Sequence, residues 1–179
     1  LDAPVSGQTI GAENGTLTVM VGGNVQGYEH ALPAMRAFGK LIKHVGESGA
    51  GFAVKAVNNM LMAVNLCAVA EGFTTLKAHG VNLHEALDCI NASSGKSMVT
   101  ETVLPQRILN RSFPVTFALP LLAKDTGIAI DLAREAKLSA PVLSLTQNLI
   151  QAASDLSDKN SDFSSAVKMY ESWSNITIE

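Results

Sequence analysis

The hydrophobic and polar positions of the first 48 residues predict short strands separated by glycine-rich segments. Residues 16–21, Thr-Leu-Thr-Val-Met-Val, have the β-branched, apolar character of a buried strand, and Gly22 and Gly23 end it. Residues 1–6 and residues 44–46 predict two further short strands. The pattern of this part of the chain is therefore typical of an α/β domain, of which only a remnant is present.

Two segments connect these predicted strands. Residues 7–15 are punctuated by glycines and predict a loop. The apolar spacing over residues 28–42 is helical, with Pro33 near the predicted start, where its missing N–H costs little. We assign residues 1–48 to this α/β remnant.

Residues 49–179 have a different, helical pattern. Residues 53–78, rich in Ala, Leu, Met and Val, predict one long helix, and Gly80 is a natural stop after it. Ser97 and Ser139 are candidate helix caps. Shorter helices are predicted over residues 84–93, 97–110, 119–138, 142–156 and 163–173. The fold class is thus mostly α, with an α/β remnant followed by an all-helical domain.

Composition narrows the function classes. With 47% apolar and 16% charged residues the chain is not disordered, and a net charge of −3 argues against a protein that binds nucleic-acid phosphates. The longest uncharged run near the middle, residues 56–70, is too short to predict a membrane span. Cys67 and Cys89 form no disulfide framework, so we expect a reducing, cytoplasmic location. The chain opens with Leu1 in strand-like sequence, as a piece of a longer protein would.

Polar residues interrupt one stripe of the long predicted helix. Residues spaced by three and four share a helical face, and one such face carries Lys55, Asn59, Met62, Leu66 and Phe73. One interpretation is a lysine that extends its ammonium into water from a packed helix. The other is a lysine in a functional cleft, with the asparagine beside it.

A second stripe poses a similar question. Leu121, Asp125, Ile128 and Leu132 share a helical face on which only the aspartate is polar. Carboxylates are rarely buried without a partner, and Lys124 lies on the flank, where we expect it not to share this face. Asp125 is therefore either held by a cap or an ion pair, or it marks a face that approaches another domain.

The remaining signals are weak or negative. The glycine-rich turn after Ser6, beginning at Gly7, could present backbone N–H groups to an anion such as a carboxylate, although glycines there can serve the turn alone. No G-x-G-x-x-G and no G-x-x-x-x-G-K-[ST] motif is present. His79 and His84 straddle a predicted helix break, so no metal site is predicted.

Five segments of the chain carry further information when taken together: Asp2-Ala3-Pro4-Val5-Ser6-Gly7, Gly15-Thr16-Leu17, Met20-Val21-Gly22-Gly23, Gly51-x-x-x-Lys55-x-x-x-Asn59 and Lys124-Asp125. Together they resemble the β-hydroxyacid dehydrogenases, the family of 3-hydroxyisobutyrate dehydrogenase and tartronate semialdehyde reductase. The resemblance runs through nearly the whole chain. It implies the C-terminal portion of such an enzyme, with a Rossmann-type remnant over residues 1–48 and a substrate- and cofactor-closing, dimerising helical domain over residues 49–179.

The resemblance implies roles for the substrate-side residues. Ser6 and Gly7 would hold the substrate carboxylate, Lys55 would transfer the proton as the catalytic residue, and Asn59 would orient the substrate. The family pattern has a second glycine where this chain has Gln8, which leaves the identity of the substrate open.

On the cofactor side, the resemblance places Lys124 near the nicotinamide, with Asp125 fixing that site and Phe117 closing on the substrate. The implied reaction is hydride transfer between a small 3-hydroxyacid and NAD or NADP, with this chain inactive by itself. The implied partners are the hydroxyacid and a second copy bound through the helical domain, with neither nucleic acid nor membrane. The alternative is a non-catalytic helical dimerisation module or a catalytically silent relative.

Overall fold

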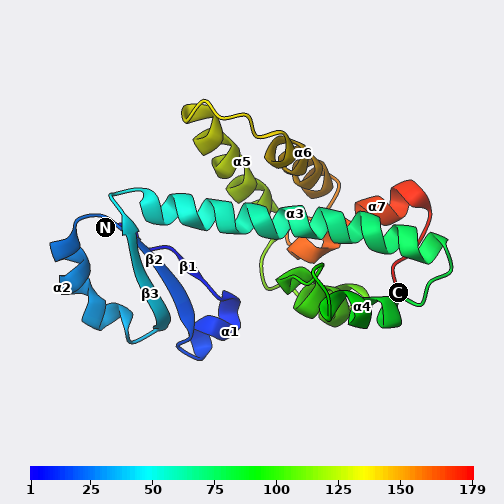
Figure 1. Cartoon of the computed structure of the whole chain (residues 1–179), viewed down its shortest axis with the longest axis horizontal. Helices are drawn as coiled ribbons and strands as arrows, with labels where there is room; N and C mark the ends of the chain where they lie inside the picture. The colour runs from blue at the N-terminus through cyan, green and yellow to red at the C-terminus, as the bar shows by residue number, and fades with distance from the viewer. The chain divides into compact units, whose positions relative to one another are not determined.

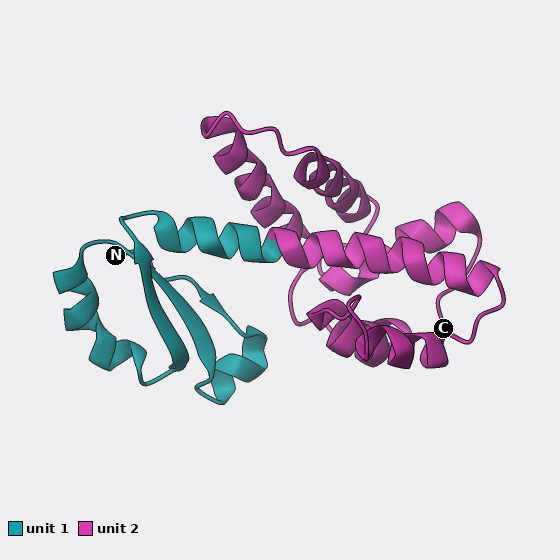
Figure 2. Ribbon diagram, in the orientation of Figure 1, with its two compact units in different colours: residues 1–59 teal, residues 60–179 magenta.

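The computed structural model describes residues 1–179 and divides into two compact units, residues 1–59 and residues 60–179 (Figure 2). Helix α3, Ala50–Ala78, contributes its first ten residues to the first unit and the rest to the second. The sequence predicts a domain boundary between residues 48 and 49, which lies just before α3, whereas the two compact units meet within the helix. The predicted boundary stays a prediction.

The first unit is built on a three-stranded sheet in the order β1-β2-β3 (Figure 1). Its strands are β1, Val5–Ser6; β2, Leu17–Gly22; and β3, Gly39–Gly46. β2 lies in the middle, antiparallel to β1 and parallel to β3. Val19 and Val21 of β2 are fully buried and, with Met35, form the small core of this unit. The predicted strand over residues 16–21 is confirmed.

The segment after Gly7 is helical, so the predicted loop over residues 7–15 is wrong. Helix α1 covers Gln8–Glu13. Gly11 lies inside this helix, on the side that packs against β2. A Cβ at this position would lie 3.0 Å from Cδ2 of Leu17. Gly11 is thus buried against Leu17, with little free space for a side chain.

The predicted helix over residues 28–42 is wrong in its second half. Helix α2 covers Val25–Met35 and begins after Asn24, whose side chain accepts a hydrogen bond of 2.7 Å from the backbone N–H of Gly27. Pro33 therefore lies inside the helix near its end, and not near its start. The residues that follow form β3, because parallel pairing with β2 outweighs local apolar spacing.

All the secondary-structure elements labelled in the second unit are helices (Figure 1), and Ala118 and Asp162 form one isolated antiparallel β-bridge. After α3 its helices are α4, Leu83–Asn91; the π-helical η1, Val99–Ile108; α5, Leu119–Glu135; α6, Pro141–Asp155; the 3₁₀-helical η2, Phe163–Ala166; and α7, Val167–Ser174. Helices α5 and α6 pack on each other. One hydrophobic core joins these elements, and among its fully buried side chains are Leu104, Ile108, Leu119, Leu122 and Phe163.

Helix ends in this unit follow two of the three predicted signals. Gly80 has the left-handed φ of 72° and terminates α3, as predicted. Ser97 and Thr100 exchange side chain–backbone hydrogen bonds at the start of η1, which confirms Ser97 as a cap. Ser139 does not cap α6: the helix begins after Ala140, and no side chain caps it.

Helix α3 is long and apolar enough to cross a membrane by length and composition, with 29 residues and a mean hydropathy of 1.5 over its most apolar window. The uncharged run over residues 56–70 covers only the middle of α3, and the helix reaches this length because it extends beyond that run at both ends. Within that window 39% of the positions are buried in the protein. Ala63, Leu66 and Phe73 belong to the core of the helical unit, so α3 also meets the description of a central core helix.

Candidate active site

The turn at Ser6 and Gly7 is fixed by the sheet. Ser6 ends β1 opposite Thr18 of β2 and is half-buried. Gly7 has a φ of 137°, a backbone conformation that residues other than glycine rarely adopt. A Cβ at this position would lie 2.9 Å from Cδ2 of Leu17. Gln8 follows with a positive φ of 57° and starts α1. The chain therefore turns sharply at Ser6 and Gly7, the position where the sequence predicts a binding site for the substrate carboxylate.

Asp2 anchors the start of α3. Its carboxylate accepts hydrogen bonds from the backbone N–H groups of Gly49, at 2.7 Å, and Phe52, at 2.9 Å. At Gly51 the helix comes so close to the sheet that a Cβ would collide with the carbonyl oxygen of Met20 and lie 2.7 Å from Oδ2 of Asp2. The first glycine of the G-x-x-x-K-x-x-x-N segment is thus a packing requirement. Because Gly51 allows this close approach of α3 to the sheet, it also determines where Lys55 lies, one turn further along the helix.

The hydrogen bond from the backbone N–H of Gly49, with those from Phe52 and Gly51, lowers the pKa of the Asp2 carboxyl below its ordinary value of 3.8. A carboxyl whose pKa is lower in the folded than in the unfolded state stabilises the fold when the pH is above its unfolded-state pKa. This stabilisation is lost as the pH falls through its folded-state pKa. We therefore predict that Asp2→Asn lowers the melting temperature most at neutral pH. The difference from wild type should shrink below about pH 3.8, as measured by thermal unfolding across the acid range. A difference that is the same at every pH would contradict this role of the Asp2 charge.

Lys55 and Asn59 lie on one face of α3, as the helical period predicts. Lys55 is half-buried and Asn59 is buried, and the face continues through buried Leu66 and Phe73. The side-chain amide of Asn58 donates a hydrogen bond of 3.2 Å to Oδ1 of Asn59. One helical turn separates the amine and the amide, about 6 Å along the axis. Lys55 and Asn59 belong to the same compact unit as Ser6 and Gly7.

Lys124 and Asp125 lie on α5 in the second unit and form an ion pair, with 3.2 Å between Nζ and Oδ1. Although Lys124 lies on the flank of the stripe, its flexible four-carbon side chain reaches the neighbouring carboxylate, so Asp125 is held by an ion pair, one of the alternatives that the sequence left open. The Lys124 side chain is 63% exposed and that of Asp125 15%. The stripe around them is not buried in this chain: Leu121 is 48% exposed and Ile128 41%.

Phe117 lies in the segment that leads into α5. Its side chain is half-buried against the core, and its ring centroid is 6.2 Å from that of Phe163. Its backbone N–H donates to Oδ2 of Asp162 at 3.3 Å. Phe117 is therefore held by its backbone and its ring in one place on the helical unit, which also carries Lys124 and Asp125.

Sequence reasoning missed a buried polar group centred on Asp162. This aspartate and Arg107 are almost fully buried and form an ion pair of 3.3 Å. Burial by itself raises the pKa of Asp162, but hydrogen bonds from the Ser164 hydroxyl and from backbone N–H groups of Thr116, Ser164 and Phe117 outweigh it and lower that pKa. The available signal was the Asp-x-Ser pattern at residues 162–164, which here caps η2.

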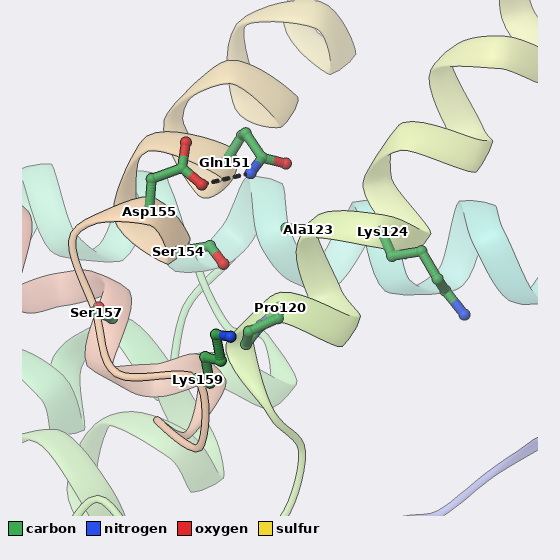
Figure 3. A pocket seen from close by; sticks show the side chains of 8 residues that line it. All are labelled: Pro120, Ala123, Lys124, Gln151, Ser154, Asp155, Ser157 and Lys159. Carbon is green, nitrogen blue, oxygen red and sulfur yellow. Dashed lines mark hydrogen bonds between the residues drawn. The ribbon is translucent and has the colours of Figure 1, made fainter.

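A cavity of about 580 Å³ opens between α5 and α6 (Figure 3). Gln151 and Asp155 are hydrogen-bonded at 2.8 Å on its α6 side, and Lys159 lies near Pro120. Lys124 also lines it, but its ammonium points away from the other labelled side chains. The structure contains no group of three His, Cys, Asp or Glu side chains that could hold a metal ion.

Comparison with known proteins identifies the family. Residues 49–170 match the family described as NAD-binding of NADP-dependent 3-hydroxyisobutyrate dehydrogenase, and residues 1–46 match the NAD-binding domain of 6-phosphogluconate dehydrogenase. The fold is that of an NAD(P)-binding hydroxyacid dehydrogenase, with a small sheet that is consistent with a truncated Rossmann domain. The chain belongs to the 3-hydroxyisobutyrate dehydrogenase family.

Individual relatives agree with this assignment. The chain is 34% identical to 2-(hydroxymethyl)glutarate dehydrogenase of Eubacterium barkeri over 99% of its own length, and 35% identical to NAD-dependent L-serine dehydrogenase of Pseudomonas aeruginosa over 96%. It spans 59% of each of these two relatives. Among solved structures, Mycobacterium tuberculosis 3-hydroxyisobutyrate dehydrogenase with L-serine has a TM-score of 0.86 and 31% identity, over 94% of this chain and 60% of that one.

Proposed function

We propose that this chain is part of an NAD(P)-dependent dehydrogenase that oxidises a small 3-hydroxyacid at its hydroxyl carbon. The observation that carries the proposal is the placement of half-buried Lys55 and buried Asn59 on one face of α3, in the same compact unit as Ser6 and Gly7. Both the amine that proton transfer requires and an amide that can orient a substrate are present in this chain, which favours a catalytic protein over a silent relative. The alternative of a purely structural helical module is therefore the weaker one.

The names of three relatives suggest a substrate class for the proposed enzyme. 2-(Hydroxymethyl)glutarate, 3-hydroxyisobutyrate and L-serine each carry a CH₂OH group on the carbon next to a carboxylate, and they differ in the third substituent of that carbon. We infer that the substrate of this enzyme has the same HO–CH₂–CH(R)–COO⁻ frame. Gln8, where the family pattern has glycine, stands beside the proposed binding site for the carboxylate and is a candidate for selecting R.

In the proposed mechanism the residues of the first unit bind the substrate and move one proton. Ser6 and the backbone at Gly7 hold the carboxylate, and Asn59 orients the hydroxyl toward Lys55. As the alcohol is oxidised to the aldehyde, its hydroxyl proton passes to the Lys55 amine; in the reverse direction the Lys55 ammonium returns it. A positioned acid–base group of this kind contributes about 10²- to 10⁴-fold to a rate.

NAD or NADP, when bound, supplies the hydride chemistry. Lys124 and Asp125 fit a role at its edge, because the exposed Lys124 ammonium is a hydrogen-bond donor and the neighbouring carboxylate holds it in place. The chain carries no glycine-rich pyrophosphate motif. We propose that the pyrophosphate is bound by residues outside these 179, so that this chain alone is inactive.

The proposal predicts a specific pattern of activity. The full-length enzyme should reduce NAD or NADP with 3-hydroxyisobutyrate, L-serine or 2-(hydroxymethyl)glutarate, followed at the absorbance band of the reduced nicotinamide. Lactate, which has its hydroxyl on the carbon next to the carboxylate, is the matched control and should react poorly. The 179-residue chain alone should show no turnover. Faster oxidation of lactate than of every CH₂OH acid, or full activity of the isolated chain, would contradict the proposal.

We also propose that the helical unit mediates homo-oligomer formation and that the protein is cytoplasmic. Apolar side chains of α5, of α6 and of the loop between them support the first point, because they are exposed in the single chain: Leu121, Ile128, Leu138, Val142 and Leu145. An exposed apolar surface of this kind is typical of protein interfaces.

A further inference from the structure

Helix α5 follows the segment 109–118, which carries Phe117 and is called the Phe117 segment below. The N-cap position of α5 is Ala118, and no side chain caps the helix. Instead, the backbone pairs with the segment before η2: Leu119 N–H donates to the carbonyl of Ser161 at 2.8 Å, and Phe163 N–H donates to that of Phe117 at 2.8 Å. The start of α5 is therefore fixed by residues more than 40 positions away in the sequence.

The Asp162 carboxylate completes this arrangement. Its Oδ2 accepts from the backbone N–H of Thr116 at 3.0 Å, from that of Phe117 at 3.3 Å and from the Thr116 hydroxyl at 3.2 Å. Its Oδ1 accepts from the Ser164 hydroxyl at 2.5 Å and from the Ser164 N–H at 3.0 Å. Every one of these bonds ties either the Phe117 segment or η2 to the same carboxylate.

Arg107 holds the carboxylate from the other side. Its Nη1 lies 3.3 Å from both oxygens of Asp162 and also donates to the Thr116 hydroxyl. The guanidinium carbon lies 5.1 Å from the centroid of the Phe163 ring, and that ring in turn packs near Phe117. Buried Arg107, Asp162 and Phe163, together with half-buried Thr116, therefore form one frame around the backbone of Phe117.

We infer that Arg107 and Asp162 are positioning residues for the dehydrogenase reaction. They fix Phe117 and the first turns of α5, on which Lys124 lies about 7.5 Å along the axis from the helix start. The inference rests on the proposed function, because it assumes that Phe117, Lys124 and Asp125 contact the substrate or the cofactor. Neither Arg107 nor Asp162 needs to touch either molecule.

A second ion pair in the same unit provides a matched control. Arg111, one turn after Arg107, binds Glu171 through Nη1 at 2.5 Å and Nη2 at 3.0 Å. Glu171 also accepts from the backbone N–H of Ile178 at 2.8 Å, and the Arg111 guanidinium carbon lies 4.9 Å from the centroid of the Phe113 ring. This pair therefore ties the C-terminal tail to the start of the Phe117 segment, and it makes no hydrogen bond to Thr116, Phe117 or Asp162. Both arginines stabilise the unit, but only Arg107 contacts the frame around Phe117.

The test compares Arg107→Met with Arg111→Met in the full-length enzyme, at a temperature where near-ultraviolet circular dichroism shows both folded. We expect kcat/KM for the hydroxyacid to fall by about 10- to 100-fold more in Arg107→Met, because small displacements of positioning groups have effects of this size. Hydrogen exchange at the Thr116 and Phe117 amides should accelerate in Arg107→Met and not in Arg111→Met. Equal kinetic losses in the two variants, or unchanged exchange at these amides, would overturn the inference.

A milder pair of variants covers the case in which Arg107→Met does not fold. Thr116→Val removes the hydroxyl that links Arg107 to Asp162 and keeps the side-chain shape, and Thr146→Val is its control in α6. Thr116→Val should raise KM for the hydroxyacid several-fold and Thr146→Val should not; equal KM values would contradict the positioning role. Failure of the proposed function looks different, since the wild-type enzyme would then oxidise no hydroxyacid.

Discussion

Replacing Lys55 by alanine is expected to reduce kcat of the full-length enzyme by about 10²- to 10⁴-fold, the usual contribution of a positioned acid–base group. KM for the hydroxyacid should change much less, because Ser6, Gly7 and Asn59 remain to bind it. The change removes the amine that takes the hydroxyl proton and leaves the rest of α3 in place. The measurement is steady-state reduction of NAD or NADP with the fastest hydroxyacid.

Lys43→Ala is the matched control for this variant. Lys43 lies on β3 in the same compact unit but is exposed and outside the predicted site, so its loss should leave kcat unchanged. Added methylamine should restore part of the activity of Lys55→Ala, since a small amine can occupy the space of the missing one. A Lys55→Ala enzyme with wild-type kcat would remove Lys55 from the mechanism.

The largest effect on stability is expected for Asp162→Ala. This change leaves Arg107 as a buried charge without its carboxylate and removes the acceptor for the backbone N–H groups of Thr116, Phe117 and Ser164. Breaking a buried ion pair by removing one partner costs about 3–5 kcal/mol of unfolding free energy. Urea unfolding of the wild type and the variant measures the difference.

Asp131→Ala is the surface counterpart of this experiment. Asp131 pairs with Arg134 on α5 at 3.1 Å, but both side chains are more than 60% exposed, so the cost should stay below about 1 kcal/mol. If Asp162→Ala were no more destabilising than Asp131→Ala, the frame around Phe117 would not stabilise the helical unit as described.

The helical period was sufficient to predict the α3 face of the site. It placed Lys55 and Asn59 on one stripe, and burial of Asn59, Leu66 and Phe73 confirms that stripe. Gly80 ended the helix as expected from its conformational freedom. Patterns that depend on neighbours a few residues apart were therefore readable in the sequence.

Features that depend on distant partners were not readable in this way. β3 was predicted partly as helix because its pairing with β2 joins segments about 22 residues apart. The acceptor for the backbone N–H of Phe117 is Asp162, 45 residues later, and no local pattern points from one to the other. An ion pair at Asp125 was one of the alternatives left open, but the face assignment did not point to Lys124 as its partner, since it ignores the reach of a lysine side chain.

The central claim is that the Lys55 amine transfers the substrate proton, and the most direct measurement is the pH dependence of kcat for wild type and Lys55→Arg in the full-length enzyme. Arginine keeps the positive charge but stays protonated, so it cannot accept the proton. The account predicts that Lys55→Arg loses nearly all activity across the whole pH range. Near wild-type kcat in Lys55→Arg at any pH would contradict it.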